Sequence, residues 1–247
     1  MTDIKWCIEY LKRYNGIDAL PQMSDEALFR ALQNITMPHE LSAEFYQKQD
    51  AVLQNMLLSK EIVDVADFSD GISVWKGDIT LLKADAIVNA CNNKMLGCFV
   101  PGHHCIDNAI HSFAGLQVRR DMMAVMNLQG HDEPNGDCKV TKAYNLPSKY
   151  IFHTVGPIYS GVKQDEIDLA SCYRSCIKKA DEIGLASLVF CCLSTGIFGY
   201  PIEEATKIAI REVKTYLSEK NKNLRKVVFN VFREQDYDVY KRLLARD

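Results

Sequence analysis

The 247-residue sequence contains no run of about 18 consecutive apolar residues, the minimum that a membrane-spanning helix needs. Neither charge dominates, since 29 lysines and arginines stand against 32 aspartates and glutamates, and the formal net charge is −3. Such a small charge gives no long-range attraction to nucleic acid or to an anionic membrane. The start, MTDIKWCIEYLKRYNG, lacks the apolar core of a signal peptide. These absences predict a cytoplasmic protein that binds neither nucleic acid nor membrane.

The cysteines do not form the even set of a secreted disulfide framework. The chain contains nine of them, an odd number in a long sequence, so thiols or metal ligands are expected. Cys172, Cys176, Cys191 and Cys192 lie in apolar or helical segments, and packing as small hydrophobic side chains is their default interpretation. Repeats and low-complexity segments are also absent. The length therefore suits one large domain, or a domain with an appendage.

Glycine is missing between Gly16 and Gly71, where apolar residues recur at three- and four-residue spacing. This pattern predicts that residues 1–70 form a small helical extension, in which we find no chemistry-bearing cluster. From residue 71 onward, strand patterns alternate with helical ones. The expected strands are ISVWK, DAIVNA, CKVTKAYN, IFHTVG, SLVFCCL and KVVFNVF, and the expected helices span residues 104–114, 165–183, 203–219 and the segment DYDVYKRLLA. This alternation predicts that residues 71–247 form an α/β sheet covered on both faces.

The segment LSTGIFGYP, residues 193–201, joins a buried strand to a helix. Gly196 and Gly199 allow a ligand to approach the backbone closely. Backbone N–H groups and the following helix N-terminus favour an anion such as a diphosphate. The segment lacks the lysine of a Walker A loop and does not match GxGxxG. A tight strand–helix connection explains the two glycines equally well.

Two further residues suit the purine end of a nucleotide. Asp78, in GDIT, can accept a hydrogen bond from an adenine amino group, or it can cap a helical turn. Phe232 ends the strand KVVFNVF and can stack on a purine, although a core or rim aromatic is an equally good interpretation.

The segment GCFVPGHHC, residues 97–105, crowds two cysteines and two histidines together. Cys98, His103 and Cys105 form a C-x4-H-x-C set, and thiolate and imidazole ligands suit zinc. Three ligands leave a fourth position for water or substrate, which is typical of a catalytic site. A fourth ligand from His104 or His111 would instead make a structural site, and the spacing does not choose between His103 and His104. Ordinary loop residues are the remaining interpretation.

Six motifs occur together in one order: GDIT, DAIVNACN, IDNAIHSFAG, GDCKVTKAYNLPSKYIFHTVGP, LSTGIFGYP and VVFNVFREQDYDVY. This order resembles the macrodomain family of ADP-ribose-binding α/β domains, and it is most similar to the MacroD-type hydrolase branch. The resemblance covers about residues 70–247. It implies a three-layer α/β/α fold with a mixed central sheet and a cleft for ADP-ribose.

The resemblance also implies roles for individual residues. Asp78, with Ile79 beside it, matches the adenine-binding aspartate, and Phe232 matches the aromatic residue near the adenine. Asn92 matches the asparagine that contacts the distal ribose, and Asp107 matches the aspartate at a helix start. The loop around the diphosphate comprises Ser194, Thr195, Gly196, Ile197, Phe198, Gly199 and Tyr200.

One motif departs from the MacroD branch, which has a run of glycines where this chain has GCFVPGHHC. That segment resembles the zinc-dependent macrodomains, found mainly in bacteria and fungi, and the helical extension fits the same subgroup. The resemblance implies that Cys98, His103 and Cys105 hold Zn2+ in the wall of the distal-ribose pocket.

Together these motifs imply a protein-ADP-ribosylhydrolase that removes mono-ADP-ribose from modified side chains. Asn92 would fix the ribose, and Asp107 would orient or deprotonate a water that zinc activates. The resemblance further implies a sirtuin-type ADP-ribosyltransferase as functional partner and a lipoyl-carrier protein of the glycine-cleavage type as substrate. The rival interpretation is a reader module with a structural zinc, which binds ADP-ribose without cleaving it, because a fold does not decide between the two.

Overall fold

A mixed sheet of six strands forms the centre of the computed structural model, which describes residues 1–245. In chain order the strands are β2 (Gly71–Lys76), β4 (Ala86–Ala90), β5 (Cys138–Lys142), β6 (Tyr150–Thr154), β7 (Ser187–Phe190) and β8 (Lys226–Val231). Across the sheet their order is β2-β8-β7-β4-β6-β5. Neighbouring strands are parallel except β5 and β6, so the edge strand β5 runs opposite to the others.

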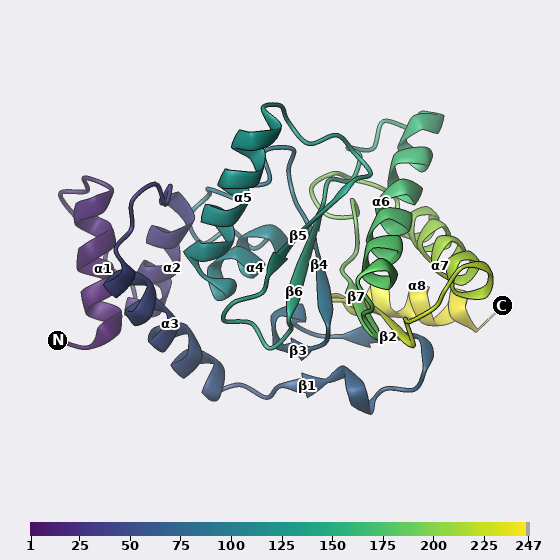
Figure 1. The fold of residues 1–247 in the computed structure, drawn as a ribbon, viewed down its shortest axis with the longest axis horizontal. Helices are drawn as coiled ribbons and strands as arrows, with labels where there is room; N and C mark the ends of the chain where they lie inside the picture. The colour runs from purple at the N-terminus through teal and green to yellow at the C-terminus, as the bar shows by residue number, and fades with distance from the viewer. Residues whose placement is uncertain (246–247) are drawn as a thin grey trace.

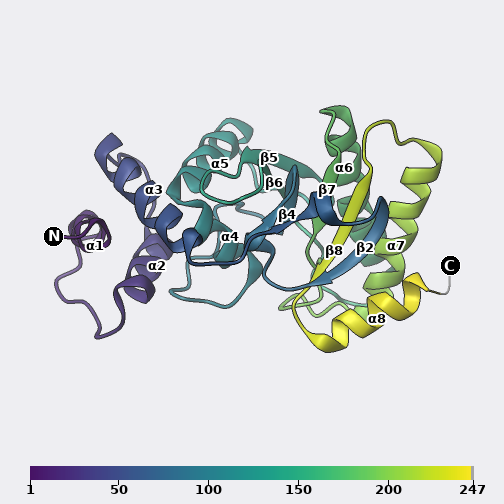
Figure 2. The ribbon, with the colours of Figure 1, turned by 90° about the horizontal axis from the view of Figure 1, so that it is seen from below.

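Helices lie on both sides of this sheet and complete three layers (Figures 1 and 2). These helices are α4 (Ile106–Ala114), α5 (Leu116–Gln129), α6 (Lys163–Glu182), α7 (Ile202–Glu219) and α8 (Glu234–Leu244). Helix α6 packs against β5 and β6, α4 against β4, and α8 against β2 and β8. The mixed sheet and its layers confirm the predicted α/β fold. Within residues 1–245, no helix is both long and apolar enough to cross a membrane.

The central strands are recognisable in the sequence because both of their faces are covered. Side chains along β7 and β8 are almost entirely buried, and Phe229 is 1% exposed in the main core. Three cysteines of that core, Cys172, Cys176 and Cys191, are also buried, whereas Cys192 is half-buried. The structure thus confirms that the three buried cysteines pack as small hydrophobic side chains.

An N-terminal bundle of three helices stands beside α4 and α5 at one end of the molecule (Figure 1). Its helices are α1 (Asp3–Tyr14), α2 (Asp25–Ile35) and α3 (Ala43–Leu58). The side chains of Ser24 and Ser42 accept hydrogen bonds from backbone amides and cap α2 and α3. The apolar side chains of the bundle form a separate core, which includes one residue of α5.

Short elements lead from the bundle to the sheet and into the first loop of the site. Strand β1 (Val63–Asp64) is followed by a 3-10 turn, η1 (Val65–Asp67), and pairs in parallel with β3 (Leu82–Lys83). A second 3-10 turn, η2 (Ile79–Leu81), connects β2 to β3. The helices of the N-terminal segment therefore end at Leu58, and the regular elements between residues 59 and 70 are the short strand β1 and the 3-10 turn η1.

Helix α5 is the one long element that the sequence pattern did not predict. Gly115, with φ +99°, separates it from the predicted helix at 104–114, and a side chain there would clash with Gln117. The buried face of α5 includes the polar residues Gln117 and Arg119 among apolar ones. These polar side chains interrupt the spacing by which an amphipathic helix is recognised.

Candidate functional site

The candidate site lies at the edge of the sheet where the parallel strands end. Because β2, β8, β7 and β4 run in the same direction, their carboxyl ends meet at one edge, where α/β sheets bind ligands. The predicted adenine residues follow β2 and β8, the predicted diphosphate loop follows β7, and the cysteine–histidine segment follows β4. The structure therefore gathers at one edge segments that lie far apart in the sequence.

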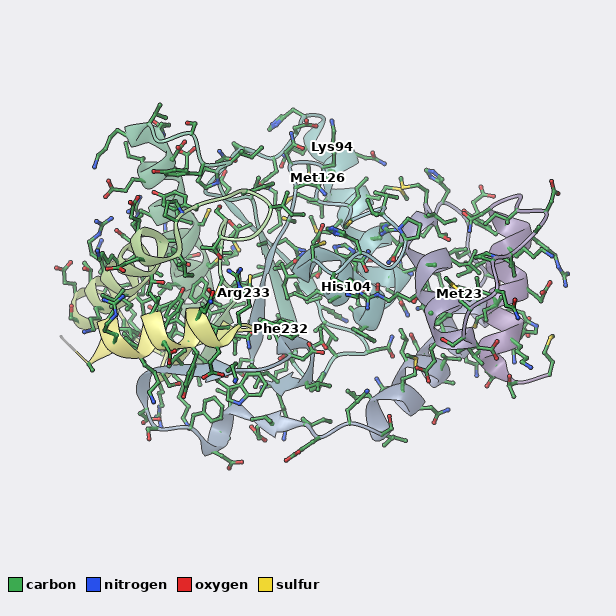
Figure 3. The ribbon with its side chains drawn as sticks, turned by 180° about the vertical axis from the view of Figure 1, so that it is seen from behind. Met23, Lys94, His104, Met126, Phe232 and Arg233 are labelled. Carbon is green, nitrogen blue, oxygen red and sulfur yellow. The ribbon has the colours of Figure 1, made fainter. Side chains whose placement is uncertain are left out.

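Asp78 and Phe232 follow the ends of two neighbouring strands. The Gly77 amide donates to the Val231 carbonyl at 2.9 Å, which holds the two strand ends together. Asp78 caps η2, since its Oδ1 accepts hydrogen bonds from the Thr80 amide at 2.9 Å and the Thr80 hydroxyl at 2.7 Å. Both bonds use Oδ1, so Oδ2 is left for a ligand donor. The Phe232 ring is 79% exposed and free to stack on a flat ligand (Figure 3).

Two of the predicted ligand contacts are engaged within the protein. The Ile79 side chain is 1% exposed and packs in the core, so only its backbone can face the cleft. Asn92 accepts a hydrogen bond from the Lys94 amide at 3.0 Å and donates one to the Gly97 carbonyl at 3.2 Å. Asn92 thereby fixes the turn that leads to Cys98, and its contact with a ribose stays a prediction.

The loop from residue 194 to 200 turns tightly, and Gly196, Ile197 and Gly199 in its middle are exposed. Ser194 has φ +61°, and its carbonyl accepts a hydrogen bond from the Tyr200 amide at 2.9 Å. The Gly199 amide donates to the Gly196 carbonyl at 3.0 Å, while Ile197 is 77% exposed. Helix α7 begins directly after this loop without a side-chain cap. An exposed turn beside an uncapped helix N-terminus suits an anion such as a diphosphate.

A second loop, after β6, packs against this one. Its first residues, Gly156 and Pro157, close one of the six motifs, but the sequence assigned this loop no role. A Cβ on Gly156 would lie 2.2 Å from the Ser194 hydroxyl oxygen, so only glycine permits this approach. The Tyr159 amide donates to the Phe198 carbonyl at 2.8 Å, and the Tyr159 ring lies 4.7 Å from that of Tyr200. These contacts fix the position of the 194–200 loop.

Cys98, His103 and Cys105 converge on one half-buried point. Their ligand atoms lie within 4.8 Å of one another, and the structure of residues 1–245 contains no other such group of His, Cys, Asp and Glu. Cys98 Sγ is 3.7 Å from His103 Nδ1. The imidazole of this group belongs to His103, and His104 is not part of it. Two sulfurs and one imidazole nitrogen fit a zinc ion and leave one tetrahedral position open.

The start of α4 holds one of these cysteines in place. Cys105 is the N-cap residue, and its Sγ accepts a hydrogen bond from the Asn108 amide at 3.3 Å. Burial raises the pKa of the Cys105 thiol to about 12, and the Asn108 amide opposes this shift. A bound metal ion would supply the positive charge that ionises such a thiol.

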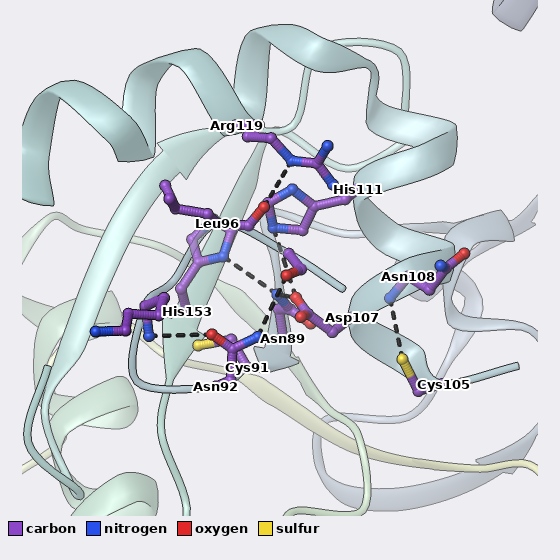
Figure 4. A network of polar contacts seen from close by, with 12 residues as sticks. Asn89, Cys91, Asn92, Leu96, Cys105, Asp107, Asn108, His111, Arg119 and His153 are labelled. Atoms are coloured by element: carbon purple, nitrogen blue, oxygen red, sulfur yellow. Dashed lines mark hydrogen bonds and ion pairs between the residues drawn. The ribbon is translucent and has the colours of Figure 1, made fainter. Parts of the chain in front are cut away.

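Asp107 is a buried carboxyl group in the first turn of α4. It is 5% exposed, and its Oδ1 accepts a hydrogen bond from Asn89 Nδ2 at 2.8 Å (Figure 4). Burial raises the pKa of Asp107 to about 6, while the hydrogen bond from Asn89 and the charge of Arg119 lower it. His111 Nε2 lies 3.5 Å from the same oxygen, and burial keeps the pKa of His111 well below its usual value. A carboxyl group with this pKa can exchange a proton near neutral pH, as a general base must.

Asn89 and Arg119 belong to this polar network, although the sequence motifs did not assign them. Asn89 is fully buried in β4 and joins Asp107 to His153, whose Nδ1 is 3.3 Å from Asn89 Nδ2. Arg119 is 1% exposed, and its Nε donates to the Leu96 carbonyl at 2.6 Å. A polar residue inside an apolar strand was the available signal for Asn89. Arg119 gave none, because its helix was not predicted.

We expect acid to destabilise the protein through His153. Its ring is buried, accepts a hydrogen bond from Asn89 at Nδ1, and has Nε2 2.9 Å from the Thr141 hydroxyl, which suits the neutral ring. Burial lowers the pKa of His153 to about 3. Since an unfolded histidine has a pKa of about 6.5, the unfolded state takes up the proton first as the pH falls. The stabilising contribution is complete above about pH 6.5 and is lost progressively toward pH 3.

From about pH 7 to pH 5, this loss should lower the free energy of unfolding by about 2 kcal/mol. Urea unfolding of the wild type and of His153→Gln at both pH values measures it. The variant should lose less stability than the wild type between the two pH values, by about the same amount. An identical pH dependence in both proteins would show that His153 does not cause it.

Both the sequence and the structure match known macrodomains. The family model described as Macro domain matches residues 88–209, which include the cysteine–histidine segment 97–105 and the 194–200 loop. A protein-ADP-ribose hydrolase of Treponema medium is 45% identical over 253 residues, with 96% of each chain covered. This chain is a macrodomain protein. The Treponema match leaves out only a small part of the chain, so it includes the helical bundle as well as the sheet.

Other relatives agree with this assignment. A protein-ADP-ribose hydrolase of Staphylococcus aureus is 46% identical over 242 residues, covering 94% of this macrodomain and 90% of the relative. The Trypanosoma brucei macrodomain in complex with ADP-ribose has a TM-score of 0.67 at 30% identity, covering 87% of this chain and 94% of that one. The Oceanobacillus iheyensis macrodomain with ADP has a TM-score of 0.64 at 37% identity, covering 70% and 89%. The predicted family and its three-layer fold are confirmed.

Proposed function

We propose that this macrodomain is a protein-ADP-ribosylhydrolase, which removes mono-ADP-ribose from modified protein side chains. The observation that supports this most is the order of groups along the sheet edge. Following β2, β8, β7 and β4 in turn, the edge carries Asp78 with Phe232, then the 194–200 loop, then the cysteine–histidine group. This is the order of adenine, diphosphate and distal ribose in ADP-ribose. The relatives named protein-ADP-ribose hydrolase, which match this chain over nearly its whole length, support the same function.

The nucleotide end would be held by groups that take no part in the reaction. Asp78 Oδ2 would accept a hydrogen bond from the adenine amino group, and the Phe232 ring would stack on the base. The backbone amides of the 194–200 loop and the N-terminus of α7 would bind the diphosphate. Binding energy from this remote end can place the linkage to be cleaved beside Cys98, His103 and Cys105.

At the distal ribose, Cys98, His103 and Cys105 would hold a zinc ion. When bound, zinc would supply a Lewis acid for a ribose oxygen or for the attacking water. Asn92 would fix the ribose, because it already orders the turn at the entrance to this segment. Asp107 would orient the water and accept its proton, since its carboxyl group is buried close to the ligands and titrates near neutral pH.

We also propose the biological setting that the GCFVPGHHC segment implies. The modified substrate would be a lipoyl-carrier protein of the glycine-cleavage type, and a sirtuin-type ADP-ribosyltransferase would attach the group that this enzyme removes. Both proteins would meet the enzyme in the cytoplasm. The resemblance of that segment to zinc-dependent macrodomains supports both partners.

Incubation with mono-ADP-ribosylated proteins of known linkage tests the function. We expect the purified enzyme to release free ADP-ribose, and an excess of a zinc chelator to stop the release. Asp78→Ala should weaken ADP-ribose binding about fivefold, because a lost hydrogen bond costs on the order of 1 kcal/mol. Calorimetry measures that affinity. ADP-ribose binding without release from any linkage would favour the reader interpretation, and absence of both would contradict a macrodomain function.

A further inference from the structure

The N-terminal bundle reaches the metal-ligand segment through polar side chains of α2. The apolar side chains of the bundle pack in its own core. Helix α2 packs against α4 and carries Arg30, which is half-buried, and Asn34, which is 1% exposed. Both residues hydrogen-bond to the segment between β4 and α4, although the metal ligands come entirely from that segment.

The planar guanidinium of Arg30 connects α4 to the turn formed by residues 98–105, which carries the proposed zinc ligands. Its Nη2 donates to the His103 carbonyl at 3.1 Å and to Asn108 Oδ1 at 2.8 Å. Its Nε donates to the same Asn108 oxygen at 3.1 Å. A guanidinium offers several donors in one fixed plane, so these three bonds set the position of the His103 backbone relative to α4.

Asn108, which Arg30 holds in place, makes two further hydrogen bonds to this turn. Its backbone amide donates to Cys105 Sγ at 3.3 Å, and its side-chain Nδ2 donates to the Val100 carbonyl at 2.9 Å. Asn34 adds a further tie from α2, because its Oδ1 accepts a hydrogen bond from the Gly102 amide at 2.9 Å. Four positions between residues 100 and 105 are thus held by Arg30, Asn34 or Asn108.

We infer that Arg30 is a positioning residue for the metal site. It acts through the His103 backbone and Asn108, and it keeps the His103 imidazole and the Cys105 thiol in the geometry that binds zinc. This inference rests on the zinc site proposed above. It gives the N-terminal bundle a role in the reaction even though the bundle supplies no ligand, acid or base.

The physical reason is the cost of ordering the ligand turn. The turn is irregular, Gly102 has φ +63°, and Val100 is 57% exposed. Ordering each residue of such a segment costs conformational entropy. A turn that is already ordered before the metal binds loses less conformational entropy on binding. It therefore binds the metal more tightly. Without Arg30 the metal-free turn is less ordered, so more conformational entropy is lost when the metal binds.

Zinc binding by the full-length protein tests the inference. Competition with a chelator of known affinity gives the dissociation constant of zinc, and cobalt substitution gives an absorption spectrum that reports thiolate ligation and tetrahedral geometry. We expect Arg30→Met to weaken zinc binding about tenfold or more and to broaden the cobalt spectrum. Arg13→Met, which removes an exposed arginine from α1, is the matched control and should bind zinc as the wild type does.

Three further outcomes are decisive. Arg30→Lys keeps the charge but loses the fork, so it should bind zinc nearly as weakly as Arg30→Met. Wild-type affinity in either Arg30 variant, with an unchanged cobalt spectrum, would overturn the inference while leaving the zinc site intact. A wild-type protein that binds no zinc would overturn the zinc site and the inference together. Melting of the metal-free proteins shows whether each variant is folded at the temperature of the measurement.

Discussion

Cys98→Ala is expected to lower the turnover of mono-ADP-ribosylated protein by at least about a thousandfold, because it removes a ligand of the proposed catalytic metal. Only His103 and Cys105 would remain, and two protein ligands are too few for a catalytic zinc site. ADP-ribose affinity should change far less, because the residues proposed to bind the adenine and the diphosphate follow other strands. Metal analysis should find about one zinc per wild-type chain and none in the variant. Turnover assays measure the hydrolysis rate of both proteins, and calorimetry measures their affinity for ADP-ribose.

Cys138→Ala serves as the control for this experiment. Cys138 is a half-buried cysteine of β5, and its loss should leave both zinc content and turnover unchanged. Melting temperatures show whether Cys98→Ala is folded, because loss of a metal can also unfold the segment that binds it. A folded, zinc-free Cys98→Ala protein that cleaves at the wild-type rate would make the metal structural. A zinc-free mechanism centred on Asp107 would then be the better account.

Asp107→Asn is expected to lower turnover by about 10²–10⁴, the usual contribution of a general base. The amide keeps the shape of the side chain and can still accept the hydrogen bond from Asn89. It removes a buried carboxylate whose pKa is raised by burial, and an ionised group of this kind opposes folding above its pKa. The variant should therefore fold, bind zinc and bind ADP-ribose. Single-turnover kinetics separate the slowed chemical step from product release.

Asp121→Asn is the matched control for Asp107→Asn. Asp121 lies in the neighbouring helix α5, where its carboxylate accepts hydrogen bonds from Arg120 and Tyr144 near the surface. Its replacement should leave turnover unchanged. If Asp107→Asn cleaves at the wild-type rate while holding zinc, the base lies elsewhere, and the proposed role of Asp107 is wrong.

Local patterns in the sequence were sufficient for most of the architecture. The central strands are covered on both faces, so their side chains are apolar throughout and stand out as short apolar runs. The helices α1 to α3 show the apolar spacing of an amphipathic face, which predicted a helical segment there. The sequence also marked Cys98, His103 and Cys105 as candidate zinc ligands, because thiolate and imidazole groups suit that metal, and the structure brings the three side chains together.

Contacts between distant segments were not readable in this way. The sequence motifs marked Asp78 and Phe232 but did not show that their strands are neighbours, and the spacing did not distinguish His103 from His104. Arg30 gave no signal at all. Its inferred role depends on the packing of α2 against α4, which brings residues 78 positions apart into hydrogen-bonding distance. Strand order and helix packing follow from how all the apolar faces are buried together, and no local pattern of residues encodes that arrangement.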